Sequence, residues 1–230
     1  LREALAEYFG GRYSRAHKAA ERAMSIRDDV HALEQDHQFQ TLATLLAAGS
    51  LHRLQDRARR DRLLERPLKL ARRGSSSPVD DGVRLLAAEW ALDDRDGPKA
   101  EALLADLNPG TARRTQALRL KLQAARLQRR PLQALNTARL LANHQAFTPA
   151  AAQALLRSLA FEALDAAHDA DQLRRAWQQM DSADQRDPFV AARAARRAAA
   201  LGAAEEGRSW LRPFWDRLDA LEPDGRTQVA

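Results

Sequence analysis

One spacing recurs along this chain: a short polar break, then a small residue, then apolar residues three or four positions apart. Residues at this spacing share one face of an α-helix, so each set predicts a helix with one buried stripe. The five sets are Ala16, Ala20 and Ala23; Ala100, Leu104 and Leu107; Ala134, Ala138 and Leu141; Leu173, Trp177 and Met180; Gly207, Leu211 and Phe214.

The sets also recur at a nearly constant distance. The first residues of the last four sets are separated by 34, 39 and 34 positions. A step near 34 is the period of the tetratricopeptide repeat, in which two antiparallel helices form each unit and a small residue lets them cross closely. We therefore expect an all-α fold, a right-handed superhelical solenoid of antiparallel helix pairs, and no sheet.

Start and stop residues place the individual helices. Thr148 and Asp187 each precede a proline, a pattern typical of a capped first turn, and Thr111 follows the turn Asn108–Pro109–Gly110 and begins an expected helix. Gly49 and Ser50 predict a turn. The expected helices span 1–9 with 12–26, 30–48 with 51–73, 80–94 with 97–107, 111–129 with 131–146, 148–167 with 169–181, and 188–201 with 204–220.

The clearest break runs from Gly74 to Pro78. It predicts N-terminal helical repeats over 1–73, a loop or linker over 74–79, and tetratricopeptide-like repeats over 80–230, most simply as one continuous solenoid. Because the chain opens on Leu1 inside an expected helix, we expect it to be a fragment of a longer protein.

Composition narrows the function classes. A net charge of +6 invites a nucleic-acid interpretation, but only four of the 37 basic residues are lysines, an arginine bias that a GC-rich genome also produces. The chain has no cysteine, which excludes disulfides and thiolate chemistry, and it has no apolar stretch long enough to cross a membrane.

Signatures of catalysis and of metal binding are missing from the sequence. It has no dinucleotide fingerprint, phosphate loop, nucleophile elbow or zinc-binding helix motif. The six histidines form no pair four residues apart, so we interpret them as surface or cap residues. Trp90, Trp177, Trp210 and Trp215 are expected to pack in the core, with partial exposure of Trp210 and Trp215 as the alternative. We therefore expect no catalytic residue, no metal and no cofactor.

Charge patterning suggests a binding face. No acidic residue occurs between Asp106 and Glu162, whereas nine basic residues do. They are Arg113, Arg114, Arg119, Lys121, Arg126, Arg129, Arg130, Arg139 and Arg157. Helical spacing places Gln116, Arg119, Gln123 and Arg126 on one predicted groove line, and Ser158, Glu162 and Asp165 on the next. The sign change between the lines favours a protein or peptide partner, while a purely solvated face remains the alternative.

Several segments resemble the tetratricopeptide part of the proteobacterial HemY proteins. They are Arg2 to Leu5 with Gly11 to Ala16, Ala117 to Leu120 with Pro131 to Leu135, and residues 188–219 with Gly202 and Trp215 to Leu218. The resemblance implies an inner-membrane protein whose repeats face the cytoplasm, with two membrane helices preceding this chain and a link to haem or porphyrin metabolism. It carries over no catalytic motif.

Three functions follow as hypotheses. The first is a non-catalytic protein-interaction scaffold, the soluble part of a membrane-anchored protein, with haem-pathway enzymes as partners that the resemblance implies. The second is a tetrapyrrole binder or carrier, in which arginines pair with the propionates of haem or porphyrin. The third, nucleic-acid binding, ranks last because no aromatic residues are interleaved with the arginines. The sequence does not define the oligomeric state.

Overall fold

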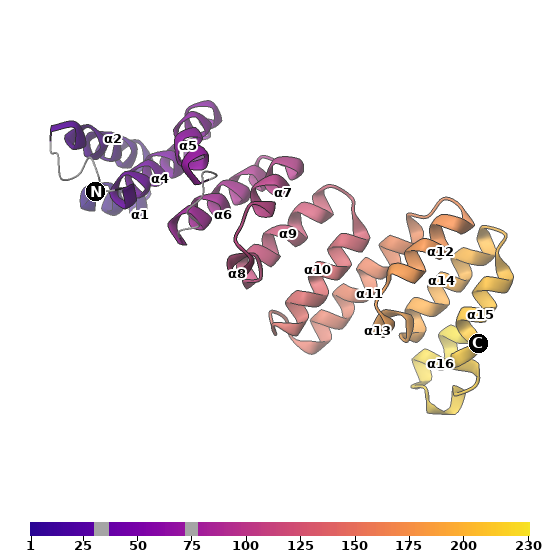
Figure 1. The fold of residues 1–230 in the computed structure, drawn as a ribbon. Coiled ribbons are helices and arrows are strands. Elements are labelled where there is room, and N and C mark those ends of the chain that lie inside the picture. The colour runs from indigo at the N-terminus through magenta and orange to yellow at the C-terminus, as the bar shows by residue number, and fades with distance from the viewer. Residues whose placement is uncertain (30–36, 72–77) are drawn as a thin grey trace. The chain divides into compact units, whose positions relative to one another are not determined.

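The computed structural model describes residues 1–29, 37–71 and 78–230. Every regular element in this part of the chain is helical, with fifteen α-helices, one short 3-10 helix and no strand (Figure 1). The predicted all-α class is therefore confirmed for these residues. The chain divides into two compact units, Leu1–Leu120 and Lys121–Ala230.

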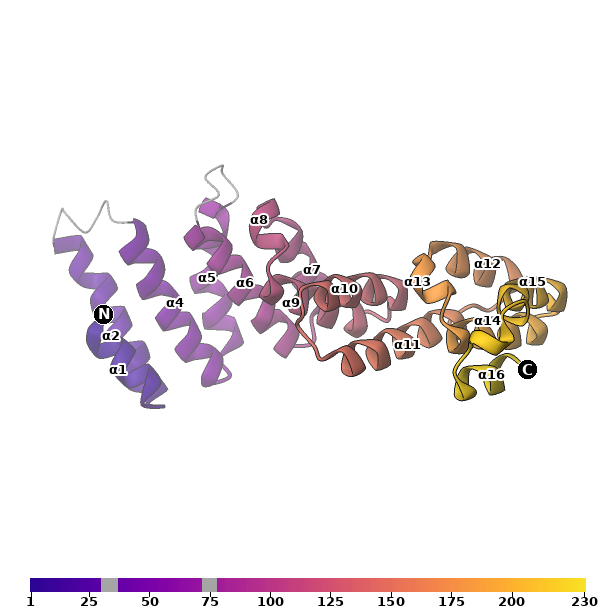
Figure 2. The ribbon, with the colours of Figure 1, turned by 90° about the horizontal axis from the view of Figure 1, so that it is seen from below.

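The first unit is built from neighbouring helices that pack in sequence order. Its helices are α1 (Arg2–Phe9), α2 (Tyr13–Asp29), α4 (His37–Arg53), α5 (Arg57–Ala71), α6 (Pro78–Asp93), α7 (Gly97–Ala105) and α8 (Pro109–Ala112). α2 packs against α1 and α4, α5 packs against α4 and α6, and α6 packs against α7 (Figure 2). α9 (Thr115–Leu127) crosses from this unit into the second.

The second unit continues the pattern. Its helices are α10 (Pro131–Asn143), α11 (Pro149–Asp165), α12 (Ala170–Gln179), α13 (Ser182–Gln185), α14 (Pro188–Ala200), α15 (Ala204–Trp215), the 3-10 helix η1 (Leu218–Ala220) and α16 (Pro223–Val229). α11 packs against α10, α12 and α14, and α14 packs against α15 and α16 (Figure 1). The packed helices of this unit are thus close to one another in the chain as well as in space.

The recurring apolar sets form the core, as the spacing predicts. All fifteen of their residues except Leu211 are buried. Ala134 and Ala138 are at most 1% exposed and pack in the core of the second unit with Leu135, Leu159 and Leu164. Because an alanine side chain is short, it lets two helix backbones approach closely where they cross. Small residues therefore mark where helices cross, and leucines fill the space beside them.

The predicted turn at Gly49 and Ser50 is wrong, because α4 continues through both residues to Arg53. A Cβ on Gly49 would lie 3.3 Å from the Tyr8 ring and 3.5 Å from the Trp90 ring, so here glycine leaves room for two aromatic side chains. The Ser50 hydroxyl donates to the Leu46 carbonyl oxygen at 2.7 Å, which satisfies it within the helix. The chain turns instead at Gln55, where φ is 62°.

Short helices also correct the predicted boundaries. The expected helix start at Thr111 is wrong, because Thr111 lies inside the unexpected helix α8, which Asn108 caps by accepting from the Thr111 backbone N–H at 2.9 Å. α13 and α16 are likewise absent from the predicted helices, although Asp181 and Pro223 start them as caps and first-turn prolines do elsewhere. By contrast, the predicted starts at Thr148 and Asp187 are confirmed, since both side chains accept backbone N–H groups.

The predicted linker lies mostly outside the described residues, as do His31, the start of the expected 30–48 helix and the end of the 51–73 helix. Pro78 and Val79, assigned to the linker, instead open α6.

The burial of two aromatic side chains also differs from the prediction. His17 is 6% exposed and buried rather than a surface residue, whereas Trp215 is 43% exposed and donates to the Val229 carbonyl oxygen at 2.7 Å. Trp90 and Trp177 are buried, as predicted.

Gly207 lies where two helices of the second unit approach each other closely. A Cβ at this position of α15 would lie 2.9 Å from the Ala195 carbonyl oxygen and 3.0 Å from its Cα, in α14. We expect Gly207→Ala to lower the free energy of unfolding by about 1–3 kcal/mol, because the backbones must move apart. In α6, Gly82 has open space around it, so Gly82→Ala should instead raise stability by up to about 1 kcal/mol. Urea denaturation measures the free energy of unfolding of both variants. If Gly207→Ala stabilised the chain, the close packing of α14 and α15 would be contradicted.

Candidate functional site

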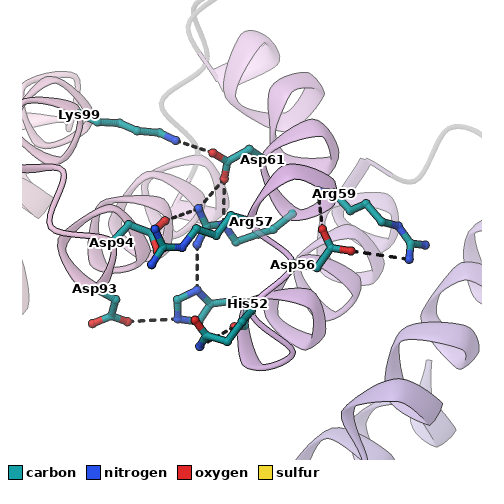
Figure 3. A network of polar contacts seen from close by, with 10 residues as sticks. His52, Asp56, Arg57, Arg59, Asp61, Asp93, Asp94 and Lys99 are labelled. Atoms are coloured by element: carbon teal, nitrogen blue, oxygen red, sulfur yellow. Dashed lines mark hydrogen bonds and ion pairs between the residues drawn. The ribbon is translucent and has the colours of Figure 1, made fainter.

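A network of charged side chains connects neighbouring helices of the first unit (Figure 3). Arg60, on α5 and 1% exposed, donates to Asp94 at 2.6 Å and to Asp61 at 2.8 Å. Its guanidinium also lies 6.0 Å from the centroid of the Trp90 ring. Asp61 in turn accepts from the Lys99 ammonium at 2.8 Å. The network therefore joins α5 to α6 and α7.

His52 takes part in this network through both ring nitrogens. Arg60 lies 2.9 Å from Nδ1, and a guanidinium only donates, so Nδ1 must accept and the ring proton resides on Nε2. Nε2 then donates to Asp93 at 3.1 Å. The ring also stacks on Trp90 with centroids 5.2 Å apart. With both nitrogens engaged and the ring packed, His52 is neither the surface residue that the sequence suggested nor a free general base.

The charges of this network compensate one another. Burial acts to raise the pKa of Asp61, but the hydrogen bonds from Lys99 and Arg60 outweigh it and hold this pKa below its ordinary value. Burial likewise acts to lower the pKa of Arg60, and the bonds to Asp94 and Asp61 outweigh it. Because each central charge already has a partner, we interpret this network as structural, and we place the candidate site elsewhere.

The basic window of the sequence is partly neutralised in space. Arg139 forms an ion pair with Asp184 of α13, and Arg157 donates to Asp187 at 2.7 Å. Arg157 also lies over the Phe189 ring, 4.0 Å from its centroid. These acids follow their arginines by 45 and 30 positions, so the acid-free stretch of sequence is not an acid-free surface.

Five of the seven predicted groove residues belong to the second unit, and the structure brings two of these five together in one pocket. Arg126 and Glu162 line one small pocket. Asp165 is instead bound by Arg193 of α14, whose Nε donates at 2.9 Å, and Ser158 is exposed on α11. On α9, Gln116, Arg119 and Gln123 are exposed, but only Gln123 lies in the second unit with Arg126.

The small pocket is lined by basic residues from the end of α9 and the start of α10, facing one acid on α11. We name it the arginine pocket; its volume is about 180 Å³. It is lined by Arg126, Arg129, Arg130, Pro131, Ala134, Glu162 and Ala166. Within the described part of the chain, the side chains of Arg126, Arg129 and Glu162 make no hydrogen bond or ion pair with another residue. These three charges are therefore available to a partner.

An apolar groove of about 610 Å³ adjoins the arginine pocket and runs between α10 and α12 across the end of α11. The two share Arg130, Pro131 and Ala166. The groove's other lining residues are Leu132, Gln133, Asn136, Thr137, Leu140, Ala163, Ala167, Gln172, Ala176 and Gln179. Sequence reasoning missed this groove, because it lies along α10 and α12 whereas the predicted lines lie on α9 and α11.

The lining residues combine apolar side chains with side-chain amides. Leu140 is 49% exposed at the groove, an apolar side chain that a partner would cover. Gln172 already accepts from the His168 backbone N–H at 3.0 Å, which leaves its amide N–H groups for an acceptor. Amides beside an apolar surface suit a polypeptide, whose backbone offers both donors and acceptors.

Two further observations concern the described residues as a whole. No helix among them is long and apolar enough to span a lipid bilayer. No group of three or more His, Asp or Glu side chains among them is arranged to hold a metal ion. Compared with known proteins, the chain matches no family model, no curated protein and no solved structure.

Proposed function

We propose that this chain is a non-catalytic protein-interaction scaffold that binds a segment of a partner protein in the apolar groove. The observation that carries the proposal is the groove itself, an open apolar surface of about 610 Å³ on α10–α12, lined by leucine, alanine and amide side chains. A groove between helices that exposes Leu140 resembles the surfaces on which proteins receive apolar segments of their partners.

The repeat architecture supports the same proposal. Contacts of the second unit recur at similar sequence separations: Arg193 binds Asp165 across 28 residues, Arg157 binds Asp187 across 30, and Arg174 binds Glu206 across 32. Such recurrence is what a solenoid of tetratricopeptide type would produce, since each repeat contacts the next in the same way. We therefore propose a right-handed superhelical solenoid, a class that commonly presents extended binding surfaces.

The scaffold proposal predicts that one surface substitution in the groove abolishes partner capture. Leu140→Glu places a charge on the apolar surface, whereas Leu218→Glu changes a comparably exposed leucine on η1, outside the groove. In a crosslinking pull-down from membranes, read by mass spectrometry, the unsubstituted chain and Leu218→Glu should recover the same specific protein, and Leu140→Glu should lose it. Equal recovery by both variants would contradict groove binding.

The HemY resemblance adds a specific version of this proposal. In that version the partners are haem-pathway enzymes at the inner membrane, and the repeats face the cytoplasm. The pull-down tests this version separately, because recovery of unrelated proteins would leave the scaffold and remove the link to haem.

A tetrapyrrole binder is the second candidate. It is favoured by the adjacency of an apolar groove and an arginine pocket, which together could hold a flat apolar ring and its propionates. The groove lining contains no histidine, methionine or tyrosine to bind a haem iron, so a metal-free porphyrin is the better probe. Titration of protoporphyrin with no change in its absorbance, and no quenching of tryptophan fluorescence, would remove this candidate.

A further inference from the structure

We propose, on the basis of the scaffold function above, that the partner segment is acidic. It places a carboxylate against Arg126 and Arg129 in the arginine pocket and a neighbouring apolar side chain on the groove between α10 and α12. This inference names the chemistry of the partner, which the apolar groove alone does not decide.

The electrostatic argument starts from the free arginines. Arg139 and Arg157 are each bound by a carboxylate, whereas Arg126 and Arg129 have no such partner within the described residues. Arg129 also has a left-handed backbone, with φ of 54°, at the turn that ends α9, so its side chain is carried by a defined turn. A carboxylate between these guanidiniums would relieve their repulsion and form charge-assisted hydrogen bonds.

Glu162 decides between a peptide and a polyanion. Glu162 lies in the same pocket as Arg126 and is exposed. A nucleic-acid strand or an anionic lipid surface brings several phosphates close together, so one or more would lie beside this carboxylate and be repelled. A peptide can present a single carboxylate and offers backbone N–H groups that Glu162 can bind. The pocket also contains no aromatic ring on which a base could stack.

The arrangement of the two cavities fixes the order of side chains in the partner. Because the pocket and the groove share Arg130, Pro131 and Ala166, a side chain in one lies next to a side chain in the other. The partner segment must therefore carry its acid close to its apolar residues. Leu132 and Leu140 provide apolar contact along α10, so leucine, isoleucine or phenylalanine beside aspartate or glutamate is the expected pattern.

The experiment selects peptides from a random displayed library on the full chain. Selected sequences should be enriched in Asp or Glu beside a large apolar residue. In fluorescence anisotropy, changing that acid to its amide should weaken binding by about tenfold, and so should the double variant Arg126→Glu with Arg129→Glu. Arg212→Glu, an exposed position of α15 outside both cavities, should bind as the unsubstituted chain does. Circular dichroism confirms that each variant is folded.

Three results would overturn the inference. In the first, the selected peptides contain no acid and bind the charge-reversed chain as well as the unsubstituted chain. This result would refute the acidic partner but not the scaffold function. A library that yields no binder would remove the acidic partner, and together with an empty pull-down it would remove the scaffold function. In the third, anionic vesicles or single-stranded DNA displace the bound peptide at a lower concentration than unlabelled peptide does. This result would assign the pocket to a polyanion.

Discussion

Replacing Arg60 by leucine is expected to lower the free energy of unfolding by about 3 kcal/mol. The substitution replaces a residue that is 1% exposed, removes one of the two arginines that bind Asp94, and leaves the Nδ1 of His52 without its donor. This loss of stability is at the lower end of what breaking a buried ion pair costs, because Arg57 still binds Asp94 at 2.8 Å and Lys99 still binds Asp61. Chemical denaturation followed by circular dichroism measures the change.

Lys99→Ala is the matched control for Arg60. It removes the other cation on Asp61, but both side chains of that pair are more than 40% exposed, so solvent screens the interaction. We expect the free energy of unfolding to change by no more than about 1 kcal/mol. If Lys99→Ala cost as much as Arg60→Leu, the burial of the network would not be the source of its stability.

Arg139→Ala is expected to lower the free energy of unfolding by about 3 kcal/mol at neutral pH, because it leaves the buried carboxylate of Asp184 without a cation. This carboxylate belongs to a residue that is 5% exposed and links α13 to α10, the helix that forms one wall of the groove. Its Oδ2 and the Nε of Arg139 have no hydrogen-bond partner in the described part of the chain. Burial therefore raises the pKa of Asp184, and the contact with Arg139 offsets this only in part.

The raised pKa fixes the sign of the pH dependence. Between the ordinary pKa of 3.8 and the raised value, the folded chain holds a proton at Asp184 that the unfolded chain releases, so stability falls as pH rises through this window. The cost of Arg139→Ala should therefore be smaller near the ordinary pKa, where Asp184 is protonated, than at neutral pH. Denaturation under both conditions tests this, with Asp184→Asn as the control that should abolish the difference. A cost that grows on acidification would contradict a contact that depends on the ionised carboxylate of Asp184.

The helices and their buried faces can be predicted because they depend on local spacing. The spacing of Ala134, Ala138 and Leu141 alone indicates which side of their helix is buried, whatever helix packs against it. Caps at Thr148 and Asp187 are predictable for the same reason, since a cap side chain bonds to residues that directly follow it. The role of Gly49 is not predictable in this way, because Tyr8 and Trp90, far away in the sequence, decide it.

The candidate site is less predictable, because it depends on which charges find partners. Arg126 and Arg139 look alike in sequence, yet Arg139 is bound by Asp184 and Arg126 has no partner among the described residues. The position of the groove depends on how α10 and α12 lie beside the end of α11, and spacing along one helix carries no such information. The sequence could therefore nominate Arg126 and Glu162 but not the apolar surface beside them.

The most direct test is to replace Leu140 with a photo-crosslinking amino acid in the full chain and to identify what it captures from membranes. Groove binding predicts a crosslinked partner protein whose attachment point lies in an acidic, apolar segment, and no such product when the crosslinker replaces Leu218 instead. Crosslinks that form equally from both positions, or from Leu218 alone, would contradict a partner site on α10–α12.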